Sequence, residues 1–221
     1  MGKDGTVNSR GSQRASVLRP FAIAAVFVVA FAVLWVFDAR LVDALRVGDV
    51  EAIKIRDWWQ FLRAVGYLPT WLAVGGALAL VSLSISRTFF APVAARRARV
   101  AGLAIVASAL ASGLAAEVVK RLVGRVRPSG DNANHFKPFL SAFTDDSNLS
   151  MPSSHAAVAF GAAWMVWRLA PAPGALALAL AAGCGLTRLL VGAHYATDVL
   201  VGAAIGYAAA ALISKALRVK A

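Results

Sequence analysis

Long uncharged segments alternate with shorter charged ones along this chain. Six segments of 16 to 20 residues contain no Asp, Glu, Lys or Arg: residues 20–37, 67–86, 100–116, 151–167, 169–187 and 199–214. An α-helix needs about 20 residues to cross the roughly 30 Å hydrocarbon core of a bilayer. The pattern therefore predicts an all-α integral membrane protein built as a six-helix bundle. The content of 59% hydrophobic residues in a chain of 221 agrees with that class.

The connections between the predicted spans differ in character. Residues 41–66 mix charged and apolar residues at helical spacing, and Trp58, Trp59 and Phe61 suit a helix that lies in the membrane interface between the first two spans. An ordinary solvated helical linker is the alternative. Residues 121–150 form the longest polar connection. Its length and its Gly, Pro, Asn and Asp content predict a functional loop.

The pattern predicts one membrane domain over residues 20–221, preceded by a disordered cytoplasmic tail over residues 1–19, which are rich in Ser and Gly. Basic residues precede the first span, as in a secretory signal, but the apolar segment is long and no clear cleavage site follows, so we expect a retained anchor. Small residues dominate the later spans, and Gly202 and Gly206 lie four apart. Such spacing favours close helix packing in lipid, in an enzyme, a pore or a transporter alike.

The charge distribution indicates a membrane and excludes nucleic acid as the partner. The net charge is +12. With the N-terminus in the cytoplasm, the inner segments hold 12 basic residues and one acid, whereas the outer segments hold 11 basic residues and 10 acids. Nearly all the excess positive charge then falls on the inner side, as the positive-inside rule expects. Both termini are therefore predicted to be cytoplasmic.

On this topology three polar clusters reach the same outer face of the membrane. They are KRLVGRVRP at residues 120–128, PSSH at residues 152–155 and TRLLVGAHYATD at residues 187–198. The clusters are far apart in the sequence and become neighbours only if the bundle closes. We therefore predict that they form one site.

The cations and serines of these clusters suit an anion. Lys120 and Arg127 are seven apart and share one face of a continuing helix, and the planar fork of an arginine fits phosphate oxygens. Arg188 lies near the end of an apolar span, where a charge is costly and usually functional. Ser153 or Ser154 can cap the fourth span, whose free N–H groups favour an anion. We interpret Arg125 as a positive flank only.

Two histidines add chemistry to this anion site. His194 and Asp198 are four apart, and a carboxylate beside one ring nitrogen makes the other a better nucleophile or base. With His155 as the second histidine, one ring can attack phosphorus while the other protonates the leaving oxygen. Histidine with carboxylate also suits a metal, but the surrounding Lys and Arg would repel a cation, so we expect no metal and no cofactor. The residues therefore predict metal-free hydrolysis of a phosphate ester.

The three clusters together resemble the signature of the type 2 phosphatidic acid phosphatase (PAP2) family, which shares its core with vanadium haloperoxidases. The matching patterns are Lys-x6-Arg-Pro, Pro-Ser-Ser-His and Thr-Arg-x5-His-x3-Asp, all within residues 100–214. The resemblance implies a PAP2-like core and a phosphohistidine mechanism. It implies His194 as the nucleophile, Asp198 as its orienting carboxylate and His155 as the general acid. The implied phosphate ligands are Lys120, Arg127, Arg188, Ser153 and the amide of Ser154.

The chain departs from the commonest family pattern at two positions. Ser154 stands where the second motif usually has glycine, and Thr187 stands where the third usually has serine. The resemblance implies a lipid phosphate substrate of a bacterial inner membrane enzyme whose active site faces the periplasm. Undecaprenyl diphosphate, phosphatidylglycerol phosphate, phosphatidate and a lipid A phosphate are the substrates considered. Two other functions stay open: vanadate-dependent halide oxidation, and non-catalytic binding or transfer of a lipid phosphate.

Overall fold

The computed structural model describes residues 7–85, 92–128 and 134–219, which form nine helices and no strand. The all-α class is thus confirmed for the described residues. The helices are α1 (Val7–Leu45), α2 (Val50–Lys54), α3 (Asp57–Ala64), α4 (Leu68–Ile85), α5 (Pro92–Val123), α6 (Phe139–Thr144), α7 (Ser154–Leu169), α8 (Pro171–Leu190) and α9 (Ala196–Ala216).

The chain divides into two compact units, residues 1–37 and residues 38–221. The first unit contains most of α1, which begins at Val7. Residues 7–19, for which the sequence predicts a disordered tail, are therefore helical in the structure. Apolar side chains of α1 are exposed, as expected for a helix that faces lipid: Val26 is 70% exposed and Val36 is 72% exposed. The assignment of residues 20–221 to one domain stays a prediction.

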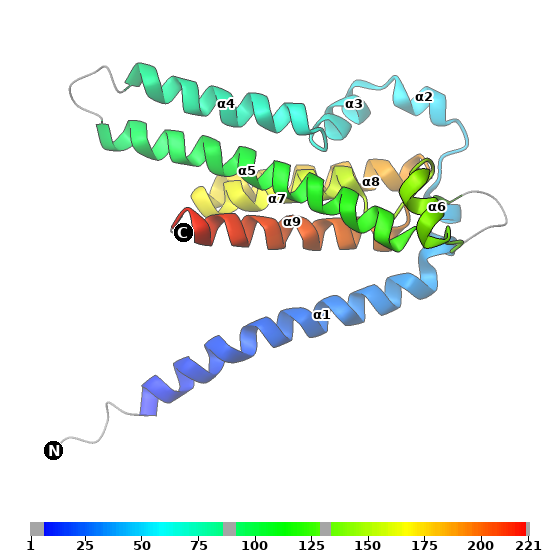
Figure 1. Cartoon of the computed structure of the whole chain (residues 1–221), viewed down its shortest axis with the longest axis horizontal. Coiled ribbons are helices and arrows are strands. Elements are labelled where there is room, and N and C mark those ends of the chain that lie inside the picture. Colours follow the sequence, from blue (N-terminus) through cyan, green and yellow to red (C-terminus); the bar gives the residue numbers. More distant parts are fainter. Residues whose placement is uncertain (1–6, 86–91, 129–133, 220–221) are drawn as a thin grey trace. The chain divides into compact units, whose positions relative to one another are not determined.

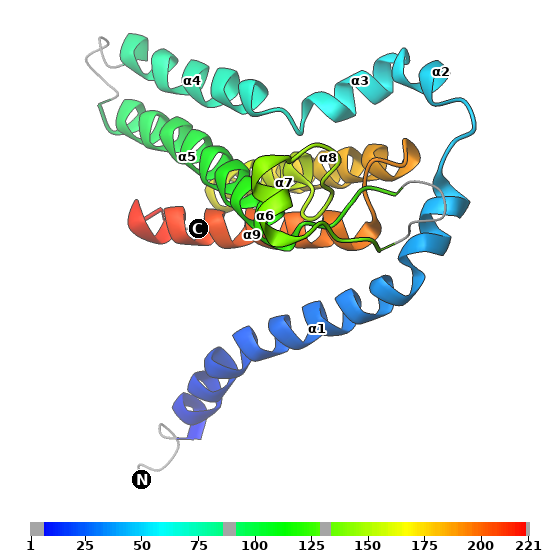
Figure 2. The same cartoon turned by 45° about the vertical axis from the view of Figure 1, so that its right-hand side comes forward.

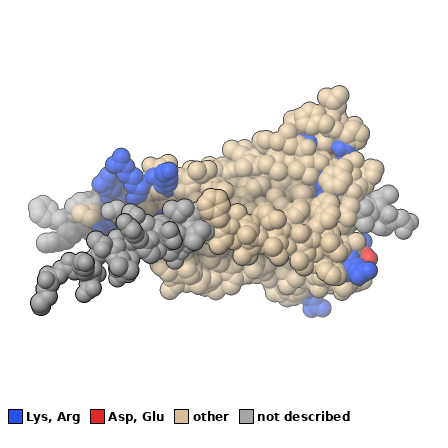
Figure 3. Space-filling view, turned by 90° about the horizontal axis from the view of Figure 1, so that it is seen from below, with Lys and Arg blue, Asp and Glu red and all other residues tan. Residues whose placement is uncertain are grey.

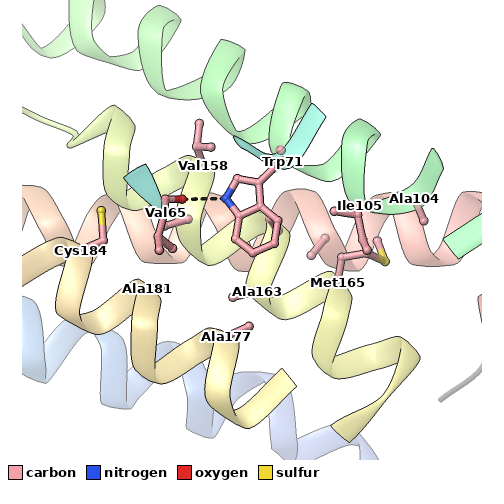
Figure 4. Packing of buried hydrophobic residues seen from close by; sticks show 14 residues of the cluster. Val65, Trp71, Ala104, Ile105, Val158, Ala163, Met165, Ala177, Ala181 and Cys184 are labelled. Atoms are coloured by element: carbon pink, nitrogen blue, oxygen red, sulfur yellow. Dashed lines mark hydrogen bonds between the residues drawn. The ribbon is translucent and has the colours of Figure 1, made fainter. Parts of the chain in front are cut away.

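In the second unit, α7 is the central helix and packs against α5, α8 and α9. Helix α4 lies along α5, as both cartoon views show (Figures 1 and 2). Helices α3 and α4 meet at a bend of 68°. At that bend the indole Nε1 of Trp71 donates a 2.6 Å hydrogen bond to the carbonyl of Val65, within the apolar cluster drawn in Figure 4.

Small residues let these helices approach closely, as the sequence predicts. A Cβ atom added at Gly202 would lie 2.6 Å from the carbonyl oxygen of Ser153, and one added at Gly206 would lie 2.5 Å from the backbone nitrogen of Gly161. Both distances are too short for any side chain. The two glycines of α9 therefore fix its contact with α7, and Gly202 does so directly beside one of the polar clusters.

Substitution of Gly206 by alanine is expected to destabilise the bundle. The added methyl group must push α9 away from α7, and overpacking of this kind costs about 1–3 kcal/mol. Gly76 in α4 is the matched control, since a Cβ there would meet nothing within 4 Å. Gly76→Ala should leave the melting midpoint in detergent unchanged or raise it, because alanine favours a helix by about 1 kcal/mol. Equal midpoints for the two variants would contradict the close packing.

Length and composition make this an integral membrane protein. Among the described residues, four helices are long and apolar enough to span a membrane, and the bent pair of α3 and α4 raises the number to as many as five. Helix α7 has 16 residues and falls short of that test. The count of six spans and the interfacial helix stay predictions. On the face shown in Figure 3, Lys and Arg side chains gather toward the two ends.

Candidate active site

The three polar clusters meet at one end of the second unit, which confirms their predicted convergence. The backbone N–H of Ser150 donates a 2.7 Å hydrogen bond to the carbonyl of Arg125. This bond joins the segment that follows α5 to the segment that precedes α7. The N–H of Ser153 donates to the carbonyl of Asp198 at 3.0 Å, which joins the start of α7 to α9. Backbone hydrogen bonds therefore hold the clusters in register.

The ring of His194 is held by a backbone carbonyl as well as by a carboxylate. Its Nδ1 lies 2.9 Å from the carbonyl oxygen of Ser150 and 3.6 Å from Oδ2 of Asp198. That same Oδ2 accepts a 2.8 Å hydrogen bond from the N–H of Tyr195. The sequence predicts Asp198 as the orienting group, whereas the shortest contact is with Ser150, at the end of the polar loop.

These contacts decide which ring nitrogen of His194 is available. A carbonyl oxygen can only accept, so Nδ1 must carry the proton, and Nε2 keeps its lone pair. His194 is 3% exposed and lies between α8 and α9. Burial lowers the pKa of His194 below its ordinary value, although the neighbouring Asp198 opposes the effect. The ring is therefore neutral near pH 7 and suited to nucleophilic attack through Nε2.

Arg125 is fully buried, so its interpretation as a mere positive flank is wrong. Its Nη1 donates to Oδ1 of Asp198 at 2.9 Å and to the hydroxyl of Thr197 at 2.7 Å. Its Nη2 donates to Oδ2 of Asp38 at 3.0 Å and also to the side chain of Asn134. The guanidinium further stacks 3.8 Å from the centroid of a tyrosine ring, that of Tyr195. Arg125 thus joins the end of α1, the polar loop and the start of α9.

Asp38 completes this buried network and carries no sequence signal of its own. It is fully buried, and its Oδ1 accepts a 3.1 Å hydrogen bond from the N–H of Thr197. Its Oδ2 also accepts a hydrogen bond from the Thr197 hydroxyl. Asp38 and Asp198 share one arginine, so the network holds two carboxylates for one cation. Its role is to fix the start of α9, and with it the carboxylate beside His194.

Lys120 is brought to the start of α7, where it meets a partner that sequence reasoning missed. Its Nζ donates to the hydroxyl of Ser154 at 2.6 Å and to Glu117 at 3.0 Å. The Ser154 hydroxyl in turn donates to Glu117 at 2.5 Å. The spacing of Glu117 and Lys120, three residues apart on one helix, is the signal that could have found this pair. The serine that replaces the usual glycine therefore anchors the lysine.

Two other hydroxyls of the motifs have structural contacts. The side chain of Ser153 accepts a 3.4 Å hydrogen bond from the N–H of Ala156 and caps α7, as the sequence predicts. The hydroxyl of Thr187 donates back to the carbonyl of Cys184 at 2.7 Å. Thr187 is fully buried in α8. Its replacement of serine therefore leaves the surface of the site unchanged.

Arg127 and Arg188 line one polar cavity of about 430 Å³. The Nε of Arg127 donates a 3.2 Å hydrogen bond to the carbonyl of Leu149, which holds the side chain in place. Arg188 is only 7% exposed, and its buried Nε has no hydrogen-bond partner among the described residues. Ala193, directly before His194, lines the same cavity. The remaining lining residues are Val50, Lys54, Trp59, Arg63, Pro128, Asn148, Val191 and Gly192.

His155 stands at the start of α7 against the bend between α3 and α4. Its ring packs against the ring of Tyr67, with centroids 5.2 Å apart, and its buried Nε2 has no hydrogen-bond partner in the described part of the chain. A buried nitrogen without a partner suits a ligand that brings one. Within the same described residues, no three His, Cys, Asp or Glu side chains gather as a metal site.

Trp59 differs from the interfacial anchor that its sequence suggests. It is 3% exposed and lines the cavity, whereas its neighbours Trp58 and Phe61 are 46% and 59% exposed. Helix α3 thus turns one aromatic face toward the site and the other outward. The segment between the first two predicted spans is therefore part of the site wall.

Comparison with known proteins agrees with this arrangement. The sequence model of the PAP2 superfamily matches residues 101–220, more than half of the chain, so the chain belongs to the PAP2 superfamily. The crystal structure of a transmembrane PAP2 type phosphatidylglycerolphosphate phosphatase from Bacillus subtilis is similar in fold, with a TM-score of 0.58 at 20% identity. That similarity covers 90% of this chain and 95% of the other.

Two curated relatives are similar in sequence over shorter stretches. A lipid A 1-phosphatase of Rhizobium etli is 39% identical over 102 residues, which cover 43% of this chain and 41% of that protein. A decaprenylphosphoryl-5-phosphoribose phosphatase of Mycobacterium tuberculosis is 35% identical over 108 residues, which cover 48% of this chain and 56% of that protein. The matched stretches thus span about half the length of these relatives.

Proposed function

We propose that this protein is a membrane lipid phosphatase that hydrolyses a phosphate ester or diphosphate through a phosphohistidine, without a metal. Its site would face the outer side of the membrane, as the charge pattern predicts, and the family resemblance implies that this membrane is a bacterial inner membrane. The names of both curated relatives describe phosphatases that act on phosphorylated lipids. Membership of the PAP2 superfamily supports the same class of substrate.

The phosphate would be held by side chains and by a helix start. Arg127 and Arg188 line the cavity, and guanidinium groups bind phosphate oxygens in pairs. Lys120 approaches from α5 and lies beside Ser154 at the first turn of α7. The free N–H groups of that turn and the cap residue Ser153 add donors to the same anion.

In the first step, Nε2 of His194 attacks phosphorus and the bond from phosphorus to the leaving oxygen breaks. The leaving oxygen takes the electron pair, and His155 supplies its proton. His155 acts in its protonated form in this step. The phosphorylated His194 ring keeps its proton on Nδ1 and becomes positively charged. Asp198, at 3.6 Å, and the Ser150 carbonyl, at 2.9 Å, stabilise that charge.

In the second step, a water molecule attacks the phosphohistidine. His155, now neutral, accepts a proton from this water, the bond from Nε2 to phosphorus breaks, and inorganic phosphate leaves. Both histidines then return to their starting states. The reaction needs positioning and charge stabilisation, which the fixed cations supply.

One observation carries this proposal: the buried His194, whose Nδ1 faces the Ser150 carbonyl, directly follows Ala193 in the lining of a cavity that two of the predicted phosphate ligands, Arg127 and Arg188, also line. A protein that only binds or transfers a lipid phosphate needs the cations. It has no use for a histidine tautomer fixed for attack.

Phosphate release by the purified full chain in detergent tests the proposal. The substrates are prenyl diphosphate, phosphatidylglycerol phosphate, phosphatidate and lipid A, each with and without EDTA. We expect turnover of at least one of them, unchanged by EDTA. Binding of these lipids with no release from any would contradict hydrolysis and favour a carrier. Loss of release with EDTA would contradict the metal-free mechanism.

A further inference from the structure

The cavity beside His194 carries more positive charge than the three motifs supply. Besides Arg127 and Arg188, its lining includes Lys54 at the end of α2 and Arg63 in α3. Among the residues that the structure describes, the lining contains no Asp or Glu. Lys54 pairs at 2.6 Å with Glu51, a side chain that is 82% exposed and outside the lining. A concave surface with four cations and no carboxylate in its described lining suits an anion.

Arg63 is held in place by aromatic rings, which leave its N–H groups for a ligand. Its guanidinium carbon lies 5.1 Å from the ring centroid of Trp59 and 5.0 Å from that of Tyr67. Ring faces fix a guanidinium without using its donors in hydrogen bonds. Its buried Nε has no hydrogen-bond partner, and no carboxylate of the described residues lies within 4.0 Å of it. The guanidinium of Arg63 is therefore positioned to bind an anionic ligand.

Contacts at the bend between α3 and α4 place Arg63 near His155. Tyr67 touches both: its ring lies 5.0 Å from the Arg63 guanidinium and 5.2 Å from the centroid of the His155 ring. Gly66 lies so close that an added Cβ would be 2.8 Å from Cβ of His155. Because His155 is the proposed proton donor to the leaving oxygen, Arg63 lies on the leaving-group side of the scissile phosphate.

The charge of a simple phosphomonoester does not account for this arrangement. A phosphate dianion is matched by Arg127 and Arg188, with Lys120 in addition. An uncharged alcohol as leaving group would then leave the half-buried Arg63, whose buried Nε has no hydrogen-bond partner among the described residues, without an anion to balance it. A leaving group that is itself an anion would pair with the positive charge of Arg63.

We propose that Arg63, assisted by Lys54, forms a second anion subsite for the phosphoryl group of the leaving group, so that the preferred substrate is a lipid diphosphate. This proposal rests on the proposed function and names its substrate class. His194 attacks the terminal phosphorus, the bond from that phosphorus to the bridging oxygen breaks, and the electron pair stays on the bridging oxygen. His155 protonates this oxygen, and the lipid monophosphate leaves with its charge against Arg63.

Matched substrates test the subsite. We compare kcat/KM for farnesyl diphosphate and farnesyl monophosphate, which share one lipid chain, in the wild-type protein and in Arg63→Gln. Loss of a charge-assisted contact should lower kcat/KM for the diphosphate by about 10- to 100-fold. The value for the monophosphate should change by less than about threefold, since only the second phosphoryl group meets Arg63. Arg63→Lys should retain part of the preference.

Arg56→Gln is the matched control, because Arg56 directly precedes α3, is exposed and does not line the cavity. It should change neither value. Equal losses for both substrates in Arg63→Gln, or no loss for either, would overturn the subsite while leaving the phosphatase intact. Melting midpoints of the variants in detergent separate these results from misfolding.

The subsite can also be tested if no lipid is turned over. Binding of inorganic diphosphate and of inorganic phosphate to the full chain is then measured by calorimetry. Arg63→Gln should weaken diphosphate binding by about tenfold and leave phosphate binding unchanged. Equal binding of diphosphate by wild type and variant would overturn the subsite. Absence of turnover would count separately against the proposed function.

Discussion

Replacement of His194 by alanine should reduce phosphate release from every lipid substrate by at least about a thousandfold. A nucleophile that forms a covalent intermediate cannot be bypassed by binding alone, and loss of such residues lowers kcat far more than it changes KM. Because Nε2 reaches phosphorus only in the transition state, the loss should appear in kcat and kcat/KM alike. The measurement is steady-state phosphate release with the best substrate of the panel.

The same substitution distinguishes a nucleophile from a residue that only holds phosphate. A substrate labelled in its scissile phosphate should leave label on the wild-type chain after rapid quenching in base, where phosphohistidine survives, and none on His194→Ala. Retention of label in His194→Ala would assign the nucleophile elsewhere. His135 is a matched control: it is exposed and lies in the polar loop, so His135→Ala should release phosphate normally.

Much of this molecule could be predicted because it depends on local pattern. The apolar segments predicted the membrane helices, and the small residues Gly202 and Gly206 predicted the close contact of α9 with its neighbour, α7. The convergence of the three polar clusters followed from the predicted topology, because each cluster lies at an end of a predicted span on the predicted outer side. These inferences need only the period, the length and the charge of each segment.

The missed residues depend on contacts that no local pattern contains. Arg125 and Asp38 are 87 residues apart, and Arg125 and Asp198 are 73 apart. Each looks like an ordinary flanking charge in its own segment, and only the fold makes them a buried network. Arg63 was hidden for another reason: its segment resembles an interfacial helix, and the bend after α3 turns one face of that helix toward the site.

Glu117 and Ser154 show why a motif does not predict the exact partner of each residue. The family pattern expects glycine at position 154 and leaves the lysine free. Here the serine hydroxyl bridges Lys120 and Glu117. A lysine held by a carboxylate and a hydroxyl keeps a fixed position at the start of α7 but retains less free positive charge. The cations of the cavity, Arg127 and Arg188, therefore carry more of the proposed phosphate binding.

Arg125→Met should be the most destabilising substitution in the second unit. Arg125 is fully buried between Asp38 and Asp198, and its removal leaves two buried carboxylates without their cation. Breaking a buried ion pair from one side costs about 3–5 kcal/mol, which corresponds to a fall of about 10 °C in the melting midpoint of a chain of this size. Activity should fall as well, because the carboxylate beside His194 loses its support. Thermal unfolding in detergent measures the effect.

A double-mutant cycle identifies the buried charge as the cause. Asp38→Asn alone should have a smaller effect, because Arg125 and Asp198 then form a balanced pair. In the Arg125→Met background, Asp38→Asn removes one of the two uncompensated charges and should restore part of the lost stability. Arg121→Met is the matched control: the pair of Arg121 with Asp146 is 30% and 53% exposed, and such surface pairs contribute at most about 1 kcal/mol. If Arg125→Met unfolds no earlier than Arg121→Met, the buried network does not stabilise the site. If Asp38→Asn fails to restore stability, the loss comes from packing around Tyr195 rather than from unpaired charge.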